Sequence, residues 1–332
     1  MRRRLLIALI VRFPVLPLRL ALAWGPAGHK IVASITFRRL APEQQTKLVA
    51  LLRQHPRFEE DFAKKMPNDL AAQDANEWVI QQAAIWPDIA RGLKGPGLRQ
   101  RHHHRSWHFI DLPDFLTPAD ERALKDQIKS RVNLSFDVPR DPEAQKSMNI
   151  MQAIAHSRSI VVDPQAKPQD RALHLSWLIH LVGDLHQPLH TTALFSRRLF
   201  PDGDQGGNKI PTEQRKNLHS LWDGFPGSPR FSTTRNRAVR LLEDPQMREL
   251  GERAAANQDI RAWLDESHQF ATTVAYNAEI TDFVRRFEQR GQGTDLPRLS
   301  LSEGYLKQGG AVANRCLVEA GYRLGRMLER IP

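Results

Sequence analysis

The run HLVGDLHQPLH, which spans residues 180–190, constrains the fold of this chain more than any other stretch. In a helix, His180 and Asp184 lie four residues apart and project from one face, so both side chains can reach a single ion. Pro188 ends such a helix, and His190 emerges on the following turn, where it can serve a different ion a few ångströms away. A fold that contains this run must therefore bring further metal ligands to the end of the helix.

Two other segments carry the same residue types. The segment HSLWD repeats the four-residue spacing with His219 and Asp223, and the segment WGPAGH ends on His29. Each pair alone is weak evidence, because a histidine and an acid four residues apart occur by chance on many solvated helices. Histidine nitrogens and carboxylate oxygens are, however, the ligands that zinc takes in catalytic sites, where one position stays open for water. Together the segments predict a multi-zinc site with hydrolytic chemistry.

Further candidate ligands lie outside these segments. Asp88 stands in IWPDIAR, and His108 stands in SWHFIDLP, where aromatic and apolar neighbours predict a buried setting. Taken singly, Asp88 is more typical of a helix cap, and His108 of a hydrogen-bonded core histidine. His186 lies off the ligand face of its helix, and we expect it to form an internal hydrogen bond.

Residues 1–23 have the pattern of an export signal. They contain five arginines and no acid, an apolar run, and the small-x-small ending ALA directly before Trp24. Two arginines and two prolines interrupt the apolar segment, so a buried N-terminal helix is the alternative. We expect cleavage before Trp24, which would leave residues 24–332 as the mature protein. The freed α-amine has a pKa near about 8 and can bind metal.

Composition limits the class of protein. With 332 residues, 41% of them hydrophobic, the chain can bury a substantial core, and no uncharged apolar stretch of about 18 residues follows residue 24. We therefore expect a soluble globular protein without a transmembrane segment in the mature chain. Loss of residues 1–23 would lower the net charge from +11 by five, and a basic chain favours phosphate-bearing partners, unless the excess is simply a solvated face. Cys316 is the single cysteine, so no intramolecular disulfide can form, and the metals would supply part of the stability.

Apolar residues recur at helical spacing through most of the chain, and strand-like alternation is nearly absent. Neither an internal repeat nor a low-complexity tract divides the sequence, so one domain is the simplest interpretation. We predict an all-α fold, a single helical bundle with long loops, whose core cleft holds the metal ligands. The expected helices cover residues 31–40, 43–54, 74–85, 120–130, 143–157, 170–184, 234–242, 259–285 and 302–330.

The order of these motifs resembles that of the secreted zinc-dependent nucleases of the mung bean nuclease type. This single-strand-specific nuclease and 3′-nucleotidase family is related to zinc phospholipase C, and the resemblance covers essentially all of the mature chain. The matching motifs are WGPAGH (24–29), WPDIAR (86–91), WHFIDLP (107–113), HLVGDLHQPLH (180–190), GDQGGNKI (203–210), NLHSLWD (217–223) and AGYRLGRML (320–328).

The resemblance implies a cleft with three zinc ions, and this chain fills all nine ligand positions. The first ion would be bound by Asp88, His108, His180 and Asp184. The second would be bound by the amine and carbonyl of Trp24, by His29, and by Asp184 as a bridge to the first. The third would be bound by His190, His219 and Asp223.

The resemblance also implies roles in catalysis and substrate binding. Asp184 would be catalytic because the two ions that it bridges hold and activate a water molecule. Arg91 would stabilise charge on the phosphoryl oxygens, with a structural salt bridge as the alternative. Phe109 would stack on a nucleobase and Asp111 would accept hydrogen bonds from its edge, with a core ring and a helix cap as the alternatives.

These features predict a periplasmic or secreted zinc-dependent endonuclease that cuts single-stranded DNA and RNA to 5′-phosphate products and that also removes 3′-phosphates from nucleotides. Single-stranded nucleic acid and nucleotides would be its substrates. The sequence implies no stable protein partner, and we expect a monomer.

Two other functions fit parts of the pattern. A zinc phospholipase C shares the ligand pattern but tends to use Glu at the last ligand position, where this chain has Asp223. A periplasmic protein that only binds zinc or nucleic acid would need neither an open coordination position nor Arg91.

The sequence also departs from the family pattern. The cysteines that crosslink fungal and plant members are missing, and Gly224 stands where some relatives place an asparagine that helps to hold the base. The basic run RQRHHHR at residues 99–105 is expected to form an exposed loop without a fixed role, with phosphate contact or loose metal binding as the alternatives. Base preference therefore stays open at this stage.

Overall fold

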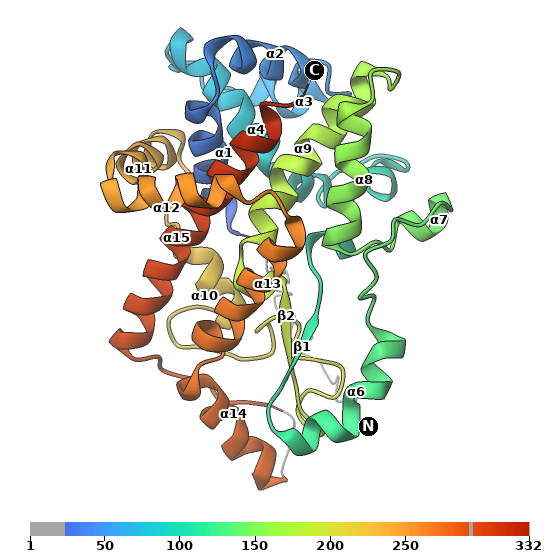
Figure 1. The fold of residues 1–332 in the computed structure, drawn as a ribbon, viewed down its shortest axis with the longest axis vertical. Helices are drawn as coiled ribbons and strands as arrows, with labels where there is room; N and C mark the ends of the chain where they lie inside the picture. Colours follow the sequence, from blue (N-terminus) through green and yellow to red (C-terminus); the bar gives the residue numbers. More distant parts are fainter. Residues whose placement is uncertain (1–23, 292–294, 332) are drawn as a thin grey trace, which may run out of the picture.

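The computed structural model of the protein describes residues 24–291 and 295–331, so the predicted export signal lies outside the described residues. Most of the described chain is helical, and its helices form one domain with long connecting segments (Figure 1). The prediction of an all-α fold is confirmed. Strand is confined to two short segments in the described part of the chain.

The secondary structure runs as follows. The α-helices are α1 (Pro26–Arg39), α2 (Pro42–Leu52), α3 (Phe58–Asp61), α4 (Ala75–Ala90), α5 (Leu98–His102), α6 (Pro118–Arg131), α7 (Pro142–Gln145), α8 (Ile150–Val162), α9 (Pro168–Leu185), α10 (Leu218–Gly224), α11 (Phe231–Glu243), α12 (Pro245–Ala256), α13 (Ile260–Phe270), α14 (Ala278–Arg290) and α15 (Glu303–Leu328). The 3₁₀ turns are η1 (Ala63–Lys65), η2 (Ala72–Asp74), η3 (Arg105–His108) and η4 (Pro188–His190), η5 (Ala271–Ala275) is a π-helical turn, and the strands are β1 (Leu112–Phe115) and β2 (Thr192–Phe195).

The central helix of the domain is α9, which packs against α1, α2, α4, α8 and α15 (Figure 1). Every residue from Leu175 to Leu185 is buried, so the polar His180 and Asp184 are enclosed together with the apolar residues of the core. The helix begins at Pro168, whose missing N–H costs nothing in the first turn, and it ends three residues before Pro188. The C-terminal half of α9 therefore carries polar side chains into the middle of the protein.

A second hydrophobic cluster lies around α10, η5 and α14, with the start of α15. Trp222 of α10 is fully buried in it, and its Nε1 donates a hydrogen bond to the Tyr305 hydroxyl at 2.9 Å. Tyr305 in turn donates to the carbonyl oxygen of Ala275 at 2.9 Å. These contacts fix the orientation of the short helix α10, which carries His219 and Asp223.

The two strands pair in parallel, with Leu112 opposite Thr192 and Phe115 opposite Phe195. The pairing begins just outside the strands, where the Ile110 amide donates to the carbonyl oxygen of His190 at 2.9 Å. The strand pair therefore holds the segment that follows His108 against the segment that follows His190.

Two of the predicted helices are interrupted. The predicted helix 143–157 is wrong between α7 and α8, because Asn149 caps α8 and forms a capping box with Gln152 that ends any continuous helix there. The predicted helix 259–285 is also wrong as one element: α13 passes into the π-helical turn η5, and Asn277 then caps α14.

Two further differences concern the end of α4 and a helix that was not predicted. Helix α4 continues through Pro87 to Ala90, five residues beyond the predicted end, and so includes Asp88 in its last turn. Helix α12 was not predicted, although Asp244 caps it and Pro245 opens it, a pair that is a recognisable start signal in the sequence.

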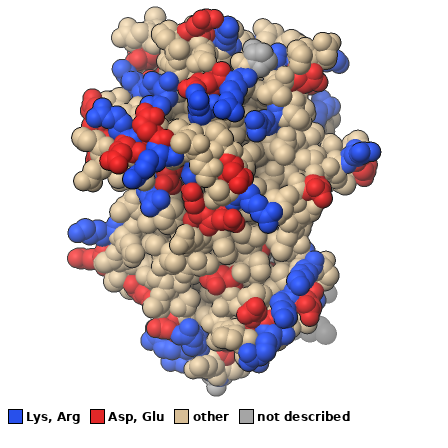
Figure 2. All heavy atoms as spheres, viewed as in Figure 1, with Lys and Arg blue, Asp and Glu red and all other residues tan. Residues whose placement is uncertain are grey.

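The surface carries both signs of charge. Figure 2 shows Lys and Arg side chains with Asp and Glu between them over the face that is drawn, including the region of α6. None of the described helices is long and apolar enough to cross a lipid bilayer.

Helices α1 and α15 approach each other closely at Gly321. A Cβ atom at this position would lie 2.4 Å from Cγ2 and 2.6 Å from Cβ of Ile35, with the Val32 carbonyl oxygen 3.3 Å away. Gly310, on the same helix, has no atom within 4 Å of the corresponding Cβ position. The two glycines therefore differ in packing but share one helix.

We expect Gly321→Ala to destabilise the protein by about 1–3 kcal/mol, because the added methyl group overpacks the contact between α1 and α15. Gly310→Ala is the matched control and should stabilise by about 0.5–1 kcal/mol through helix propensity. Denaturant unfolding of the two variants measures both effects. Equal free energies of unfolding in the two variants would contradict this account of the helix contact.

Candidate metal centre

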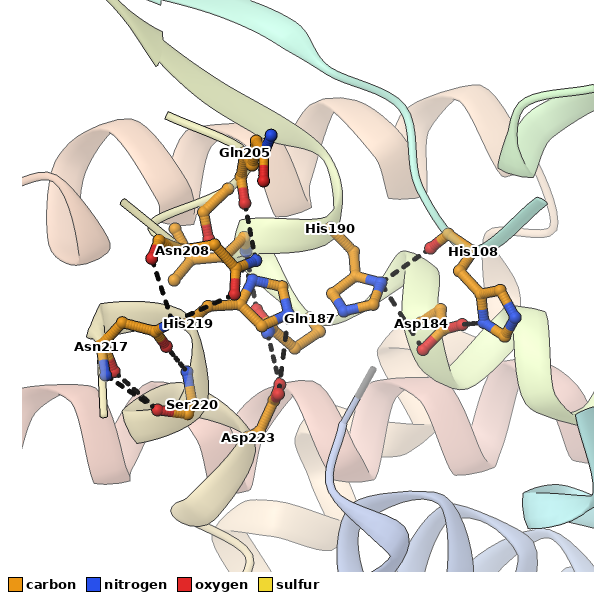
Figure 3. A network of polar contacts seen from close by, with 12 residues as sticks. His108, Asp184, Gln187, His190, Gln205, Asn208, Asn217, His219, Ser220 and Asp223 are labelled. Atoms are coloured by element: carbon orange, nitrogen blue, oxygen red, sulfur yellow. Dashed lines mark hydrogen bonds and ion pairs between the residues drawn. The ribbon is translucent and has the colours of Figure 1, made fainter. Parts of the chain in front are cut away.

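The predicted ligands converge at the C-terminal end of α9 from five different parts of the chain. His29 comes from the first turns of α1, Asp88 from the last turn of α4, and His108 from η3. Figure 3 shows Asp184 facing His108 and His190, with His219 and Asp223 on the neighbouring helix α10. All of these side chains except Asp88 are buried, and Asp88 is only slightly exposed.

The tightest group consists of His108, His180 and Asp184. Nδ1 of His108 and Nε2 of His180 each lie 3.0 Å from Oδ2 of Asp184, and these two nitrogens are 2.9 Å apart. Zinc bonds of about 2.0–2.2 Å place the ligand atoms of a tetrahedral site about 3.4 Å apart, so a shift of a few tenths of an ångström would admit an ion.

A second group adjoins the first and shares His180. One ligand atom each from His29, Asp88 and His180 lies within 4.8 Å of the others, and the His29 and His180 rings stack with centroids 3.9 Å apart. Nε2 of His29 also lies 3.3 Å from Oδ1 of Asp184, so Asp184 faces both groups, with one oxygen to each. Gly183 makes room for this, since a Cβ there would lie 2.8 Å from Nδ1 of His29.

The third group consists of His190, His219 and Asp223, with ligand atoms within 4.8 Å of one another. Nε2 of His219 lies 3.6 Å from Oδ2 of Asp223. The other carboxylate oxygen of Asp223 accepts a hydrogen bond from Nε2 of Gln187 at 2.9 Å, and the Gln187 Oε1 accepts from the Leu189 amide at 2.7 Å. Gln187 therefore sets the direction of the Asp223 carboxylate.

Backbone carbonyl groups fix the tautomers of three of the histidines. Nδ1 of His180, His190 and His219 each lies 2.7 Å from a carbonyl oxygen, which can only accept, so Nδ1 carries the proton in each ring. The lone pair is then on Nε2, which points toward the other ligand atoms of its group. This arrangement of an outer acceptor and an inner lone pair is typical of metal-binding histidines. The three acceptors are the carbonyl groups of Ala84, His108 and Gly206.

Burial dominates the electrostatics of the site. It lowers the pKa of His29, His108 and His190 well below the ordinary value, and neighbouring histidines act in the same direction. Burial also raises the pKa of Asp184 well above its ordinary range and that of Asp88 to about 6. Neutral histidines keep their lone pairs, and a buried carboxylate becomes ionised when a cation compensates it, so the site favours a bound metal over protons.

Several buried nitrogen and oxygen atoms in these groups have no hydrogen-bond partner in the described part of the chain. Because buried polar groups are nearly always paired in folded proteins, such a concentration of unpaired nitrogen and oxygen atoms needs an explanation, and a metal ion supplies one. The residues present therefore fit divalent metal ions. The unpaired atoms are both ring nitrogens of His29, Nε2 of His190, Oδ1 of Asp184 and Oδ2 of Asp88.

Trp24 and Arg91 lie at the margins of the site. Trp24 is fully buried and packs over Gly28, while the neighbouring Gly25 amide donates to the Asp223 carbonyl oxygen at 3.2 Å. The N-terminal segment is thus tied to the third group. Nη2 of Arg91 lies 3.6 Å from Oδ1 of Asp88, so the guanidinium is held beside a candidate ligand.

Phe109 and Asp111 follow His108 in the sequence and lie at a cavity. Both line a cavity of about 400 Å³, together with residues of α6 and of the segment before α8. The predicted base-binding pair is therefore next to the metal groups and faces open space.

Three residues that help to position the candidate ligands were not among the predicted site residues. They are Gln187, Asp204 and Gly206. Gln187 has no ligand chemistry of its own, and its position between His186 and Pro188 gives no signal of its bond to Asp223. Gly206 has a φ of 61°, and a Cβ there would lie 2.2 Å from the Leu189 carbonyl oxygen, so only glycine can present this backbone to His219. Asp204 holds the same loop through the amides of Leu194 and Gly207.

The remaining expectations have mixed outcomes. His186 forms the predicted internal hydrogen bond, with Nδ1 donating to the Val182 carbonyl oxygen at 2.8 Å, and its Nε2 accepts from Arg323. The prediction of an exposed loop at residues 99–105 is wrong in part. Residues 99–102 form most of helix α5, and the ring of His102 is buried against Trp86, with centroids 5.5 Å apart.

Comparison with known proteins gives consistent relatives. The family model described as S1/P1 Nuclease matches residues 24–332. The chain is similar to Endonuclease 4 of Arabidopsis thaliana, with 24% identity over 94% of this chain and 90% of the relative, and to Endonuclease 5 of the same plant, with 29% identity over 94% and 91%. It is also similar to Nuclease P1 of Penicillium citrinum, with 26% identity over 61% of this chain and 57% of that protein.

We expect Gln187→Leu to weaken metal binding at the third group about 10- to 100-fold, because Asp223 loses the hydrogen bond that orients it. The measurement is metal retained against a graded chelator. Gln81→Leu is the matched control, since Gln81 is equally buried but bonds Ser34 and Thr234. Similar loss of metal from both variants would mean that Gln187 acts only through general stability.

Proposed function

Because this chain belongs to the S1/P1 nuclease family, we propose that it is a zinc-dependent endonuclease that cuts single-stranded DNA and RNA to 5′-phosphate products. We propose further that it removes 3′-phosphates from nucleotides. The observation that carries the proposal is the convergence of the three metal-ligand groups, with unpaired acceptor atoms, beside a cavity that contains an aromatic ring and a carboxylate.

We assign three zinc ions and divide the ligands as the resemblance implies, so that Asp88, which lies in one group with His29 and His180, is given to the first ion. Asp88, His108, His180 and Asp184 would hold the first, and His190, His219 and Asp223 the third. The second would be held by His29, Asp184 and the backbone amine and carbonyl of Trp24. The approach of Asp184 Oδ1 to His29 and of Oδ2 to His108 supports its role as a bridge.

Zinc ions in such a site lower the pKa of a water molecule toward neutrality and stabilise negative charge on phosphoryl oxygens. The protein contributes position and charge. Asp184 orients the two adjacent groups relative to each other, and the buried surroundings exclude bulk water and strengthen every charge interaction within the site. Arg91, held beside Asp88, would donate to the phosphoryl oxygens as charge develops on them.

The preference for single strands would come from the cavity next to His108. Phe109 offers a ring on which a nucleobase can stack, and stacking accepts every base. A base can enter this cavity only when it is not paired within a duplex. Asp111 would accept hydrogen bonds from the edge of the stacked base.

We also propose that the protein is exported to the periplasm or secreted, and that cleavage before Trp24 completes the second zinc site. The match to the family model begins at this residue. A peptide bond before Trp24 would replace the basic amine by an amide nitrogen, which is a poor metal ligand.

Two preparations test this proposal, one that begins at Trp24 and one that retains residues before it. We expect about three zinc ions per chain and hydrolysis of single-stranded DNA and RNA from the processed form, and less zinc with little hydrolysis from the longer form. Hydrolysis of short-chain phosphatidylcholine without nucleic acid cleavage would instead assign a phospholipase C. Full zinc without either activity would indicate a binding protein.

Asp184→Ala should remove the zinc ions of both adjacent groups and reduce nucleic acid hydrolysis to background, because the variant lacks the shared ligand. Asp120→Ala is the control, since Asp120 is also buried but bonds Thr117 and Arg197 away from the site. Zinc content and initial rates decide the outcome. A variant at Asp184 with full zinc and full rate would overturn the ligand assignment.

Arg91→Ala should lower kcat by about 10²- to 10³-fold at unchanged zinc content, as expected for loss of a group that stabilises transition-state charge. Arg101→Ala, at an exposed position in the basic run of residues 99–105, should leave kcat unchanged. If Arg91→Ala instead lost zinc together with activity, the role of Arg91 would be to hold Asp88.

A further inference from the structure

The cavity beside His108 is lined by both apolar and hydrogen-bonding residues. It has a volume of about 400 Å³, which is ample for a nucleobase, and the residues that line it include Phe109, Asp111, Asn133 and Asn149. Which base such a cavity prefers depends on the polar groups that the protein leaves unused.

Both asparagine side chains are already occupied by the protein. Oδ1 of Asn149 accepts from the amides of Met151 and Gln152 at 3.0 and 3.1 Å, and its Nδ2 donates to the carbonyl oxygens of Asn133 and Ser135 at 2.9 and 2.8 Å. Nδ2 of Asn133 donates to Oε1 of Gln152 at 2.8 Å, and its Oδ1 accepts from the Ser135 amide at 3.2 Å. These amides shape the cavity wall and have little capacity left for a ligand.

Other polar groups of the cavity are also paired. The Ser106 hydroxyl donates to the Lys146 carbonyl oxygen at 3.4 Å. At the exposed rim, Nη1 of Arg131 lies 2.8 Å from Oδ1 of Asp202. Each of these groups has a protein partner within the described chain.

Asp111 differs from all of them. Asp111 is partly buried, no described residue donates a hydrogen bond to its carboxylate, and it lines the cavity. Burial raises the pKa of Asp111 to about 6, with the charge of Arg105 opposing the shift, so the group is ionised at about pH 8. The main unused polar group of the cavity is therefore a pure acceptor with two oxygens.

We propose that this cavity selects guanine among the four bases, with the Asp111 carboxylate accepting from N1–H and from the 2-amino group while the base lies on Phe109. The inference rests on the proposed nuclease function and adds the base preference to it. Guanine alone presents two adjacent donors on its Watson–Crick edge, which matches the two carboxylate oxygens and forms a bidentate, charge-assisted pair.

The other bases leave the carboxylate less well paired. Adenine and cytosine each place one amino donor beside a ring nitrogen that carries a lone pair, and this lone pair would face an anionic oxygen. Uracil and thymine offer one N–H between two carbonyl oxygens, which repel the carboxylate. A carboxylate that a bound base covers without donating a hydrogen bond to it disfavours binding strongly, so discrimination by about tenfold or more in kcat/KM is expected.

The test uses the zinc-loaded protein and all sixteen dinucleoside monophosphates, assayed at about pH 8, where Asp111 is ionised. We expect kcat/KM to be about tenfold or more higher when guanine occupies one of the two positions, whichever contacts the cavity. Equal rates for all sixteen substrates would overturn the base preference while leaving the nuclease function intact. Hydrolysis of none of them, or of longer single strands, would instead refute the nuclease function itself.

Asp111→Asn provides the sharper test, because the amide offers one donor and one acceptor in the same shape. We expect the preference to move from guanine toward adenine and cytosine, whose edges present the complementary pair. A loss of stability alone would lower the rates for all bases and would not change the order of preference among them. Retention of the guanine preference in this variant would overturn the proposal.

Asp114→Asn is the matched control. Asp114 lies on β1, three residues after Asp111, and burial also raises the pKa of its carboxyl group to about 6, but it does not line the cavity. This variant should keep the guanine preference. Phe109→Ala should raise KM for all bases by a similar factor, because stacking is tolerant of base identity. A shift of preference in Asp114→Asn would show that the effect is not local to the cavity.

Discussion

The burial of the Asp184 carboxylate is the constraint on which the rest of this structure depends. The residue lies on the most enclosed part of α9, where an ionised carboxylate without a cation would be strongly unfavourable. Histidines from α1, from η3 and from α9 itself surround it, and burial keeps those rings neutral. The neutral histidine rings do not compensate the charge of the Asp184 carboxylate. The convergence of helices α1, α4 and α9 is therefore best explained as a binding site for a cation. The close contact that Gly183 permits with His29 is then part of the same requirement.

The network around the ligands joins this site to the backbone of the whole domain. The carbonyl group of His108 accepts from His190, while the carbonyl group of His190 accepts from the Ile110 amide, so two ligand segments hold each other. Beyond the site, Arg323 of α15 donates to His186 at 3.0 Å and pairs with Glu266 of α13, which ties helices α13 and α15 to the end of α9. Positioning of the ligands is therefore distributed over segments that are distant in sequence, and helix packing and site geometry cannot vary independently.

The parts of this arrangement that the sequence predicts are those encoded by local spacing. The four-residue intervals of His180 with Asp184 and of His219 with Asp223 define one helix face each, and both helices are present. What spacing could not predict is the identity of outer partners that are backbone groups, such as the carbonyl of Ala84, because any residue type supplies the same carbonyl. The division of helix 143–157 was missed for a related reason. Its apolar period continues across the break, whereas the capping bonds of Asn149 that stop the helix depend on one side chain.

Because the candidate ligands lie between two hydrophobic clusters, bound metal ions would also stabilise the fold. His29, His180 and Asp184 lie on helices that pack in the larger cluster, whereas His219 and Asp223 flank Trp222 of the smaller one. The contact of 3.6 Å between His190 and Asp184 lies where the two sets meet. Without cations, this boundary is a row of desolvated acceptors that contribute little cohesion; with cations, the same atoms become crosslinks between the clusters. Because Cys316 is the only cysteine, no disulfide can replace them. A cation bound at this boundary therefore also stabilises the fold, so the same side chains serve the proposed activity and the stability of the protein.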